Sequence, residues 1–579
     1  MKKLNCLQPC LVFLVSAAIL SVIQPPVGWA CLAWVALVPF ILACSPKTRP
    51  KSLALAAYAV SLAYWLVNLY WILPITIAGW VALCIYTALL WPILALGLRY
   101  CRTKGMPLFL AAAVLVVGTE SLQGVFLGGF FWRFLGHSQY QNTTLIQIAD
   151  IFGASGVSFL IAMVNGLIAE LIIAAREKKI LTVAKLVKTG LVCTAVVAAV
   201  VYGRWRIGQE DEFVEAGPLV ASLQSNVPQS IKRSFKASNE LFDDLLISSK
   251  ASVQAGAELI VWPETMVQGF LDSDVWPFLK SPEKSEAYDK ALREHAEQTA
   301  YVLVGAYGAR IRQDGDYMSL DSYNSAFFYR PDGLRDLKRY DKIHLVLFGE
   351  YLPFRKSMPW LYDLLMKFTP YDTDYSLEPG RDYAVFEITD PVTDSKEDDS
   401  TAGDENETRR VFRFGTIICY EDTIPTIARK FALDEQGRKR IDWLVNISND
   451  GWFVTFKDEP GRVVPSAELA QHAAICAFRA VENRLAIVRS VNTGVSCLID
   501  SLGRIHDGYI AASRDFPAPA MKRQGMAGWF VDRMPIDRRV TFFSKCGQWL
   551  DFCCTAFTIL LIIGPFAARF FGAKKCTTH

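Results

Sequence analysis

Charged residues are scarce in the first third of this chain. Only about a dozen Asp, Glu, Lys and Arg residues fall within residues 1–174, whereas residues 205–550 carry an ordinary density of charge. Over all 579 residues, 52% are hydrophobic and 20% are charged, and the mean hydropathy is +0.24. This distribution excludes an ordinary soluble protein and is typical of a membrane domain joined to a domain that faces water.

Paired cysteines and a strong charge imbalance are also missing. None of the 14 cysteines forms a C-x-x-C pair, and no cluster of His and Cys has the spacing of metal ligands. We therefore expect no disulfide framework, no zinc or iron–sulfur site, and no other metal or cofactor. A net charge of only +3, without a basic face studded with aromatic residues, argues against nucleic acid as a partner.

Eight apolar runs approach the length of about 20 residues that crosses a bilayer. They lie at residues 8–24, 28–44, 52–73, 77–99, 106–127, 155–175, 187–204 and 550–571. The first two are short, are separated by Pro25-Pro26, and are predicted to pair as a helical hairpin. We expect seven membrane helices in residues 1–204, a water-facing domain in residues 205–549, and a last membrane helix with a short tail in residues 550–579.

Basic residues alternate between the two sides of these predicted helices. Lys and Arg precede the first helix and follow the second, fourth, sixth and eighth, whereas the other short connections have almost none. The positive-inside rule then predicts that both termini are cytoplasmic and that residues 205–550 lie across the membrane, in the periplasm of a Gram-negative cell. Residues 128–154, which are aromatic and broken by glycines, are expected to form an interfacial or re-entrant loop.

Residues 215–515 alternate between strand-like and helix-like runs. Several strand candidates, such as RFGTIICYE (413–421) and DWLVNISN (442–449), are apolar on both faces, so helices must cover the sheet. The predicted helices lie at 236–255, 285–299, 423–436 and 466–482. The alternation predicts a layered α/β domain with an internal sheet. The acidic stretch 390–410 has almost no large apolar residue and is predicted to be an exposed inserted loop.

Three short strings carry candidate catalytic residues beside these apolar runs. They place Glu264 in WPE (262–264), Lys342 in DKIHLVLFGEYLPF (341–354) and Cys419 in GTIICYED (415–422). A thiol, an acid that takes its proton and a cation near the tetrahedral intermediate are the minimum set for acyl transfer through a thioester. Each residue also has an ordinary alternative: a buried structural cysteine, a solvated turn glutamate, or one lysine of a basic group.

In this order, the three strings resemble the nitrilase, or carbon–nitrogen hydrolase, superfamily. The strings SNDGWF (448–453), QHAAICAFRAVENR (471–484) and NTGVS (492–496) are similar to further parts of that superfamily. The resemblance implies an αββα sandwich over about residues 215–515. It implies that Glu264 is the general base, Lys342 stabilises the intermediate and Cys419 is the nucleophile. It also implies supporting roles for Glu350, Tyr420 and Glu421.

With its flanking helices, the chain resembles the apolipoprotein N-acyltransferase family. The strings NLYWI (68–72), GFFWRFLGHSQ (129–139) and QIADIFGASGVSFL (147–160) are similar to the membrane half of that family. The resemblance implies transfer of an acyl chain from a phospholipid, through a Cys thioester, to the α-amine of the diacylglyceryl-cysteine at an apolipoprotein N-terminus. One departure is Arg233, which stands where the family commonly has Trp and puts a lipid contact or lid there in doubt.

Three other functions fit part of the sequence. The first is a membrane-anchored nitrilase-type amidohydrolase, which would use water as the acyl acceptor. The second is a transporter, which would carry more charged residues within its helices than this chain does. The third is an inactive relative, which would lack one of the three catalytic residues, whereas all three are present. A soluble substrate does not need eight helices, whereas drawing an acyl chain out of the bilayer costs about 0.8 kcal/mol per CH₂. We therefore expect a monomeric acyltransferase of the bacterial inner membrane, with some apolar residues of 345–348 and 360–368 facing lipid.

We predict that reporter fusions at about residue 210 and at the C-terminus report opposite sides of the membrane, because the basic connections alternate. Paired fusions to a reporter active only in the periplasm and one active only in the cytoplasm would measure this. Two fusions that report the same side would contradict the predicted topology.

Overall fold

The computed structural model describes residues 7–178, 182–227, 235–315, 317–355, 357–367, 375–389, 410–456, 463–512 and 516–572. Arg233, Phe368 and nearly all of the acidic stretch 390–410 lie outside these residues, so the expectations about them remain predictions.

Each of the eight predicted apolar runs contains helix. Five helices in the described residues are long and apolar enough to cross a membrane: α4 (Pro50–Asn68), the continuous α5 (Ile77–Ala88) and α6 (Leu90–Thr103), α7 (Leu108–Val125), α10 (Ala154–Arg176) and α11 (Val183–Ile207). The other apolar helices are shorter: α1 (Leu7–Val22), the helical turns of Ala30–Ala43, which include α3 (Val38–Ala43), those of Thr143–Phe152, and the Trp549–Ile562 part of α20 (Trp549–Gly572).

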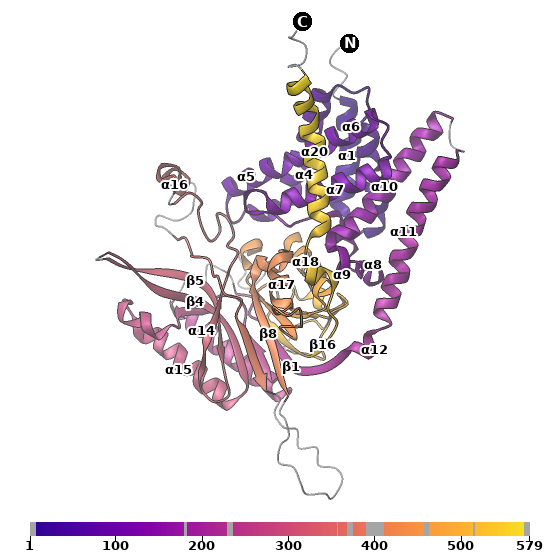
Figure 1. Ribbon diagram of the computed structural model, residues 1–579. Helices are drawn as coiled ribbons and strands as arrows, with labels where there is room; N and C mark the ends of the chain where they lie inside the picture. The colour runs from indigo at the N-terminus through magenta and orange to yellow at the C-terminus, as the bar shows by residue number, and fades with distance from the viewer. Residues whose placement is uncertain are drawn as a thin grey trace, which may run out of the picture.

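The apolar helices pack into one bundle (Figure 1). The first two runs pair as predicted, since the Phe40 N–H donates to Ser16 Oγ at 2.9 Å and the rings of Phe13 and Phe40 lie 4.5 Å apart. α20 lies along α7, where a Cβ on Gly118 would stand 2.1 Å from Thr558 Oγ1, so this close approach requires glycine. The start of α1 and the end of α20 lie at the same end of the bundle, away from the sheets (Figure 1).

Two sheets form the rest of the chain. The first has the order β15-β16-β1-β2-β4-β5-β6, with β3 beside β4. Its strands are β1 (Val214–Gln224), β2 (Leu259–Val261), β3 (Val267–Phe270), β4 (Tyr301–Asp314), β5 (Tyr317–Tyr329), β6 (Arg335–Asp341), β15 (Ile510–Ala512) and β16 (Gly528–Asp537). The second has the order β14-β13-β12-β9-β8-β7. Its strands are β7 (Val385–Thr389), β8 (Val411–Ile418), β9 (Trp443–Ser448), β12 (Ala486–Val491), β13 (Cys497–Ile499) and β14 (Ile505–His506).

The two sheets pack face to face, and helices cover their outer faces. Apolar side chains of both sheets, among them Val261, Phe328 and Phe414, share one buried core. Helices α14 (Phe235–Gln254) and α15 (Pro282–Gln298) cover the first sheet, and α17 (Pro425–Ala432) and α18 (Ala467–Asn483) cover the second. This confirms the predicted αββα sandwich. The predicted helix over 423–436 is shorter, because proline at residue 425 sets its start.

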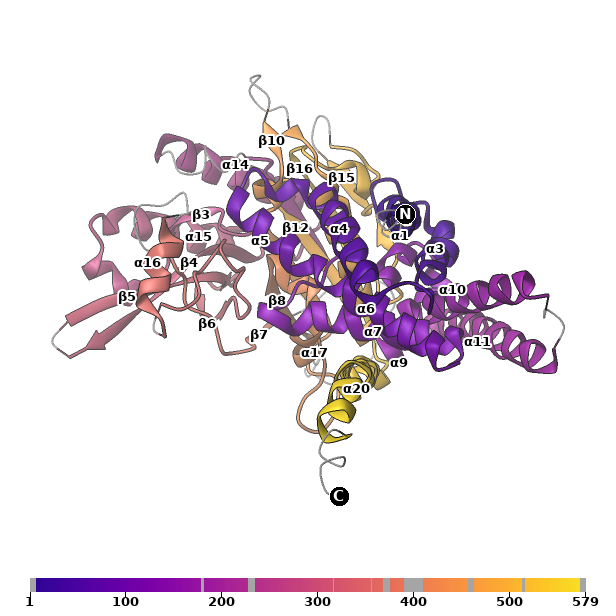
Figure 2. The same ribbon diagram turned by 90° about the horizontal axis from the view of Figure 1, so that it is seen from above.

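Residues 128–154, here called the junction segment, are the part of the chain for which the sequence predicts an interfacial or re-entrant loop. They form short helices, including α8 (Thr143–Ile146) and α9 (Ala149–Phe152), and most of their side chains are buried. Trp132 Nε1 donates to Gln471 Oε1 of α18 at 2.7 Å, and Gln147 Nε2 donates to the Leu502 carbonyl at 2.9 Å. Polar residues of the two halves thus hydrogen-bond across the contact between them. Figure 2 shows the bundle over β8 and β12, with α14 and α15 projecting beyond it.

A buried ion pair also crosses this contact. Arg484, which is 0% exposed, lies 2.7 Å from Asp150 in the junction segment and donates to Gln147 Oε1 at 2.6 Å. Arg206 of α11 pairs with the same carboxylate at 2.7 Å. Charges removed from water are stable only with such partners, so this network holds the bundle and the sandwich in one relative position.

We predict that Arg484→Met lowers stability by about 3 kcal/mol, because Asp150 would lose a buried partner. The thermal unfolding midpoint in detergent would measure this. Arg504→Met is the matched control: its pair with Glu210 is about one-third exposed on each side and should contribute about 1 kcal/mol or less. Equal midpoints for the two variants would contradict the structural role of Arg484.

Candidate active site

Each of the three candidate catalytic residues directly follows a strand of the sandwich. Glu264 follows β2 and the turn Trp262-Pro263, Lys342 follows β6, and Cys419 follows β8. Proline ends the ladder of β2, so the chain turns where Glu264 stands. β4 passes so close to this turn that a Cβ on Gly305 would lie 2.5 Å from the Pro263 carbonyl. Glycine at 305 therefore allows the turn that presents Glu264.

Lys342 lies between two carboxylates. Its Nζ is 3.6 Å from Glu264 Oε1 and 2.9 Å from Glu350, and it is 1% exposed. Burial alone would lower the pKa of Lys342, but the neighbouring carboxylates of Glu350 and Glu264 raise it above its usual value. Lys342 is therefore a permanent cation at neutral pH.

Asn324 of β5 was not predicted and fixes both carboxylates. Its side-chain Nδ2 donates to Glu264 Oε1 at 2.6 Å and to Glu350 Oε1 at 2.9 Å. Its main-chain carbonyl accepts the main-chain N–H of Lys342 at 2.8 Å. Glu350 also accepts the Val346 N–H at 2.9 Å. Glu350 thus lies beside Lys342 in the structure, and its supporting role remains a prediction.

Cys419 stands at the sharp turn from β8 into the 3₁₀ helix η6 (Cys419–Thr423) with a φ of 54°. A positive φ is costly for a residue with a side chain and clusters at functional sites. Burial raises the pKa of the thiol above its usual value. The nearby Glu264 raises this pKa too, while Lys342 and His472 lower it. The net effect of the surroundings is a protonated thiol that needs a base, which is the role that the family resemblance implies for Glu264.

Glu421 supports the site from behind. It is fully buried and accepts four hydrogen bonds: from the Tyr340 hydroxyl and from the N–H groups of Ile343, His344 and Ile418. Burial raises the pKa of Glu421 to about 7, although these hydrogen bonds lower it. Its role in the geometry is to join the end of β8 to the chain around Lys342.

Tyr420 connects the site to the membrane half. Its hydroxyl accepts the Phe131 N–H at 2.9 Å, and its ring stacks on Trp132 with centroids 6.4 Å apart.

Of the apolar residues predicted to face lipid, Leu345 is instead buried, whereas Trp360 and Leu364 are exposed on α16 (Pro359–Met366).

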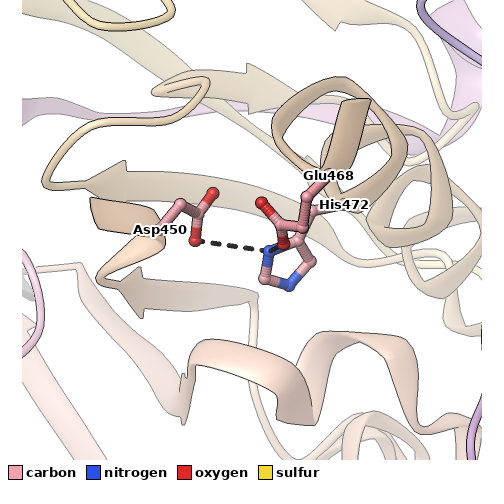
Figure 3. Close-up of side chains that lie close together, drawn as sticks. All are labelled: Asp450, Glu468 and His472. Carbon is pink, nitrogen blue, oxygen red and sulfur yellow. Dashed lines mark ion pairs between the residues drawn. The ribbon is translucent and has the colours of Figure 1, made fainter. Parts of the chain in front are cut away.

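A buried group of charges beside Cys419 was not predicted. His472 Nε2 lies 2.7 Å from Asp422, and its Nδ1 lies 3.1 Å from Glu468 and 3.4 Å from Asp450 (Figure 3). Arg489 pairs with Asp422. The strings SNDGWF and QHAAICAFRAVENR contain Asp450 and His472, but nothing in them shows that the two meet.

These side chains have the composition of a cation site, because Asp450, Glu468 and His472 bring ligand atoms within 4.8 Å of one another. Their charges fit a histidinium better. Burial opposes a charged ring, but Asp422 and Asp450 raise the pKa of His472 well above its usual value. Burial also raises the pKa of Glu468 to about 7. Two cations, His472 and Arg489, then face two carboxylates, and the group is nearly neutral without a metal ion.

Comparison with known proteins gives the family. Residues 16–167 match the family described as Apolipoprotein N-acyltransferase N-terminal domain, and residues 219–514 match the Carbon-nitrogen hydrolase family. The apolipoprotein N-acyltransferase of Geobacter metallireducens is 33% identical over 515 residues, which cover 86% of each chain. The chain belongs to the apolipoprotein N-acyltransferase family.

Other relatives agree over nearly the whole length. The apolipoprotein N-acyltransferase of Chlorobaculum tepidum is 27% identical over 83% of this chain and 84% of that protein, and the one from Rhodopirellula baltica is 24% identical over 92% and 93%. An amidase of known structure from Nesterenkonia is 14% identical over 56% of this chain and 92% of its own, with a TM-score of 0.32, which adds nothing to the family assignment. The protein is therefore an acyltransferase and a multi-pass membrane protein, as the sequence predicted.

We predict that Glu264→Gln lets iodoacetamide modify Cys419 at lower pH than in the unchanged protein, although acyl transfer is lost. The Glu264 carboxylate raises the pKa of this thiol, so its removal lowers the pKa and leaves Lys342 beside the thiolate. Peptide mass spectrometry across a series from neutral to alkaline pH would measure the rate of modification.

The matched control is Glu294→Gln on the exposed face of α15, which should leave the rate unchanged at every pH. A Glu264→Gln profile that stays in place or moves to higher pH would contradict the electrostatic role of Glu264.

Proposed function

We propose that this N-acyltransferase moves a fatty acyl chain from a phospholipid to the α-amine of the N-terminal diacylglyceryl-cysteine of apolipoproteins. The observation that carries the proposal is the meeting of Cys419, Glu264 and Lys342 at strand ends, beside the contact with the membrane helices. The family of the chain supports the same reaction.

In the first half-reaction, Glu264 takes the thiol proton as Cys419 Sγ attacks the ester carbonyl of the phospholipid. Lys342 faces the negative charge that develops on the carbonyl oxygen. Glu264 then returns the proton to the leaving glycerol oxygen. A lysophospholipid departs, and the acyl chain remains on Cys419 as a thioester. The raised pKa of the Cys419 thiol favours proton removal during attack over a thiolate present beforehand.

In the second half-reaction, the α-amine of the apolipoprotein attacks the thioester. Glu264 takes a proton from the amine, an amide forms, and the thiol of Cys419 is restored. Water must stay away from the thioester in between. The aromatic contacts of Tyr420 and the burial of Cys419, which is 8% exposed, support exclusion of water.

We also propose that the sandwich faces the periplasm, that both termini are cytoplasmic, and that the enzyme acts as a monomer without a cofactor. The start of α1 and the end of α20 lie on the far side of the bundle from the sandwich, which supports this orientation (Figure 1). α11 ends at Ile207 and α20 begins at Trp549, which supports domains of residues 1–204, 205–549 and 550–579.

We predict that enzyme mixed with phospholipid alone carries one acyl mass on the peptide containing Cys419, and that hydroxylamine removes it. Two half-reactions on one nucleophile also imply ping-pong kinetics. Cys419→Ala should form no thioester and lose several decades of rate, whereas Cys193→Ala, at an exposed position of α11, should behave as the unchanged protein.

Turnover by Cys419→Ala would contradict the covalent mechanism. Release of free fatty acid instead of N-acylated product, in the presence of a diacylglyceryl-peptide, would favour the nitrilase-type amidohydrolase.

A further inference from the structure

A cavity of about 80 Å³ lies in the membrane half, against the junction segment. About 10–15 Å³ of such space holds one water molecule, so the cavity has room for a group of several heavy atoms. Most of its walls are apolar, including Leu20, Trp91 and Leu94, but Arg133 and Glu120 also line it. Ionisable residues among membrane helices mark functional sites by default.

The cavity lies at the end of the bundle nearest the sandwich. Its walls come from the last turn of α1, the end of α4, the start of α6, the end of α7 and residues 133–135. These helix ends face the sheets (Figure 1). The ends of α4 and α7 lie at the level of the lipid headgroups when these helices span a bilayer.

Arg133 has an unusual set of hydrogen-bond partners for a cation that lines a cavity among membrane helices. Its Nε donates to the Tyr64 hydroxyl at 2.9 Å, and its Nη2 donates to the carbonyls of Leu20 at 2.9 Å and Ser21 at 3.3 Å. Among the described residues, Arg133 pairs with no carboxylate, and its Nη1 donates to no protein acceptor. The carbonyls at the end of α1 offset only part of a full positive charge. A guanidinium that is partly removed from water therefore calls for an anion.

The backbone around Arg133 is held firmly. Arg133 has a φ of 58°, a left-handed conformation that is unfavourable for a residue with a side chain. Gln24 donates to the Phe134 carbonyl, Gln123 donates to the carbonyls of Phe130 and Trp132, and Glu120 accepts the Leu135 N–H. Three polar side chains thus fix the strained loop that presents Arg133.

The other side of this loop is the wall of the active site. The Phe131 N–H donates to the Tyr420 hydroxyl, and the Trp132 ring lies 5.6 Å from the ring of His472. Arg133 is one residue from Trp132, and it lines the cavity among α1 and α4. In a glycerophospholipid, the phosphate and the acyl ester are only a few bonds apart, so a group that holds the phosphate also limits where the ester can lie.

We propose that Arg133 binds the phosphate of the donor phospholipid through Nη1 and so positions the acyl ester for attack by Cys419. This rests on the proposed function and adds the residue that recognises the donor. Planar guanidinium groups suit phosphate oxygens. The ordinary alternative is that Arg133 only caps the carbonyls of α1.

The experiment compares two acyl donors of equal chain length: a phospholipid, and a p-nitrophenyl ester that has no phosphate. Acylation of Cys419 is followed by mass spectrometry in the full-length protein. For Arg133→Gln we expect the KM for phospholipid to rise about tenfold or more, the loss of one charge-assisted hydrogen bond, with kcat/KM for the aryl ester unchanged. Arg133→Lys should recover part of the loss.

Arg102→Gln is the matched control. Its Nη1 also donates to backbone carbonyls near a helix end, those of Ile41 at 3.0 Å and Leu42 at 3.1 Å, but Arg102 does not line the cavity. It should change neither donor's KM. An equal loss with both donors in Arg133→Gln would make the residue a structural cap and overturn the proposal. Competition by inorganic phosphate as strong as that by phospholipid would assign the site to a free anion and would also overturn it.

A failure of the proposed function gives a different result. In that case the unchanged protein would be acylated at Cys419 by neither donor. Retention of phospholipid by the purified protein, counted by native mass spectrometry, then decides on Arg133. Fewer bound lipids in Arg133→Gln than in Arg102→Gln would support the phosphate site, and equal numbers would overturn it.

Discussion

The geometry of the active site depends on one buried carboxylate that joins the two sheets. Glu421 follows β8 and accepts hydrogen bonds from β6 and from the chain just after Lys342. A carboxylate without donors would be costly to bury, so all four hydrogen bonds must form together. This requirement sets where the end of one sheet stands relative to the other. Lys342 and Cys419 therefore lie close together because of a third residue, Glu421, which need not touch the substrate. Glu421 accepts all its hydrogen bonds in only one arrangement of the two sheets.

Charge balance imposes a second constraint around the thiol. Behind Cys419, Asp422 lies between His472 and Arg489, all fully buried. In front of it, Lys342 lies between Glu264 and Glu350. Each cation has carboxylate partners, so neither group needs water. This lets the site stay dry, which suits a thioester that must outlast the exchange of substrates.

The membrane half also contributes to the site, beyond anchoring it. The junction segment places Trp132 against Tyr420 and His472 and directs Arg133 toward the helices. The same segment carries Asp150, the buried partner of Arg484. An α/β sandwich cut away from the bundle would therefore expose the rings around Cys419 and leave Arg484 without its counter-ion. The two halves form one catalytic unit, because the wall between them is shared.

The sequence by itself determined the features that depend on neighbours along the chain. Apolar length revealed the membrane helices, and the apolar runs just before WPE and Cys419 predicted strands that end beside Glu264 and Cys419. The strand before Lys342, β6, is rich in charged residues and was not predicted. Only the tertiary structure decided that Asn324 holds two carboxylates, that His472 lies beside the thiol, and that the junction segment is buried. A polar residue in an apolar helix has the same local pattern whether it faces solvent or a distant partner. Which one it faces is decided by packing between segments hundreds of residues apart, where burial makes a partner obligatory.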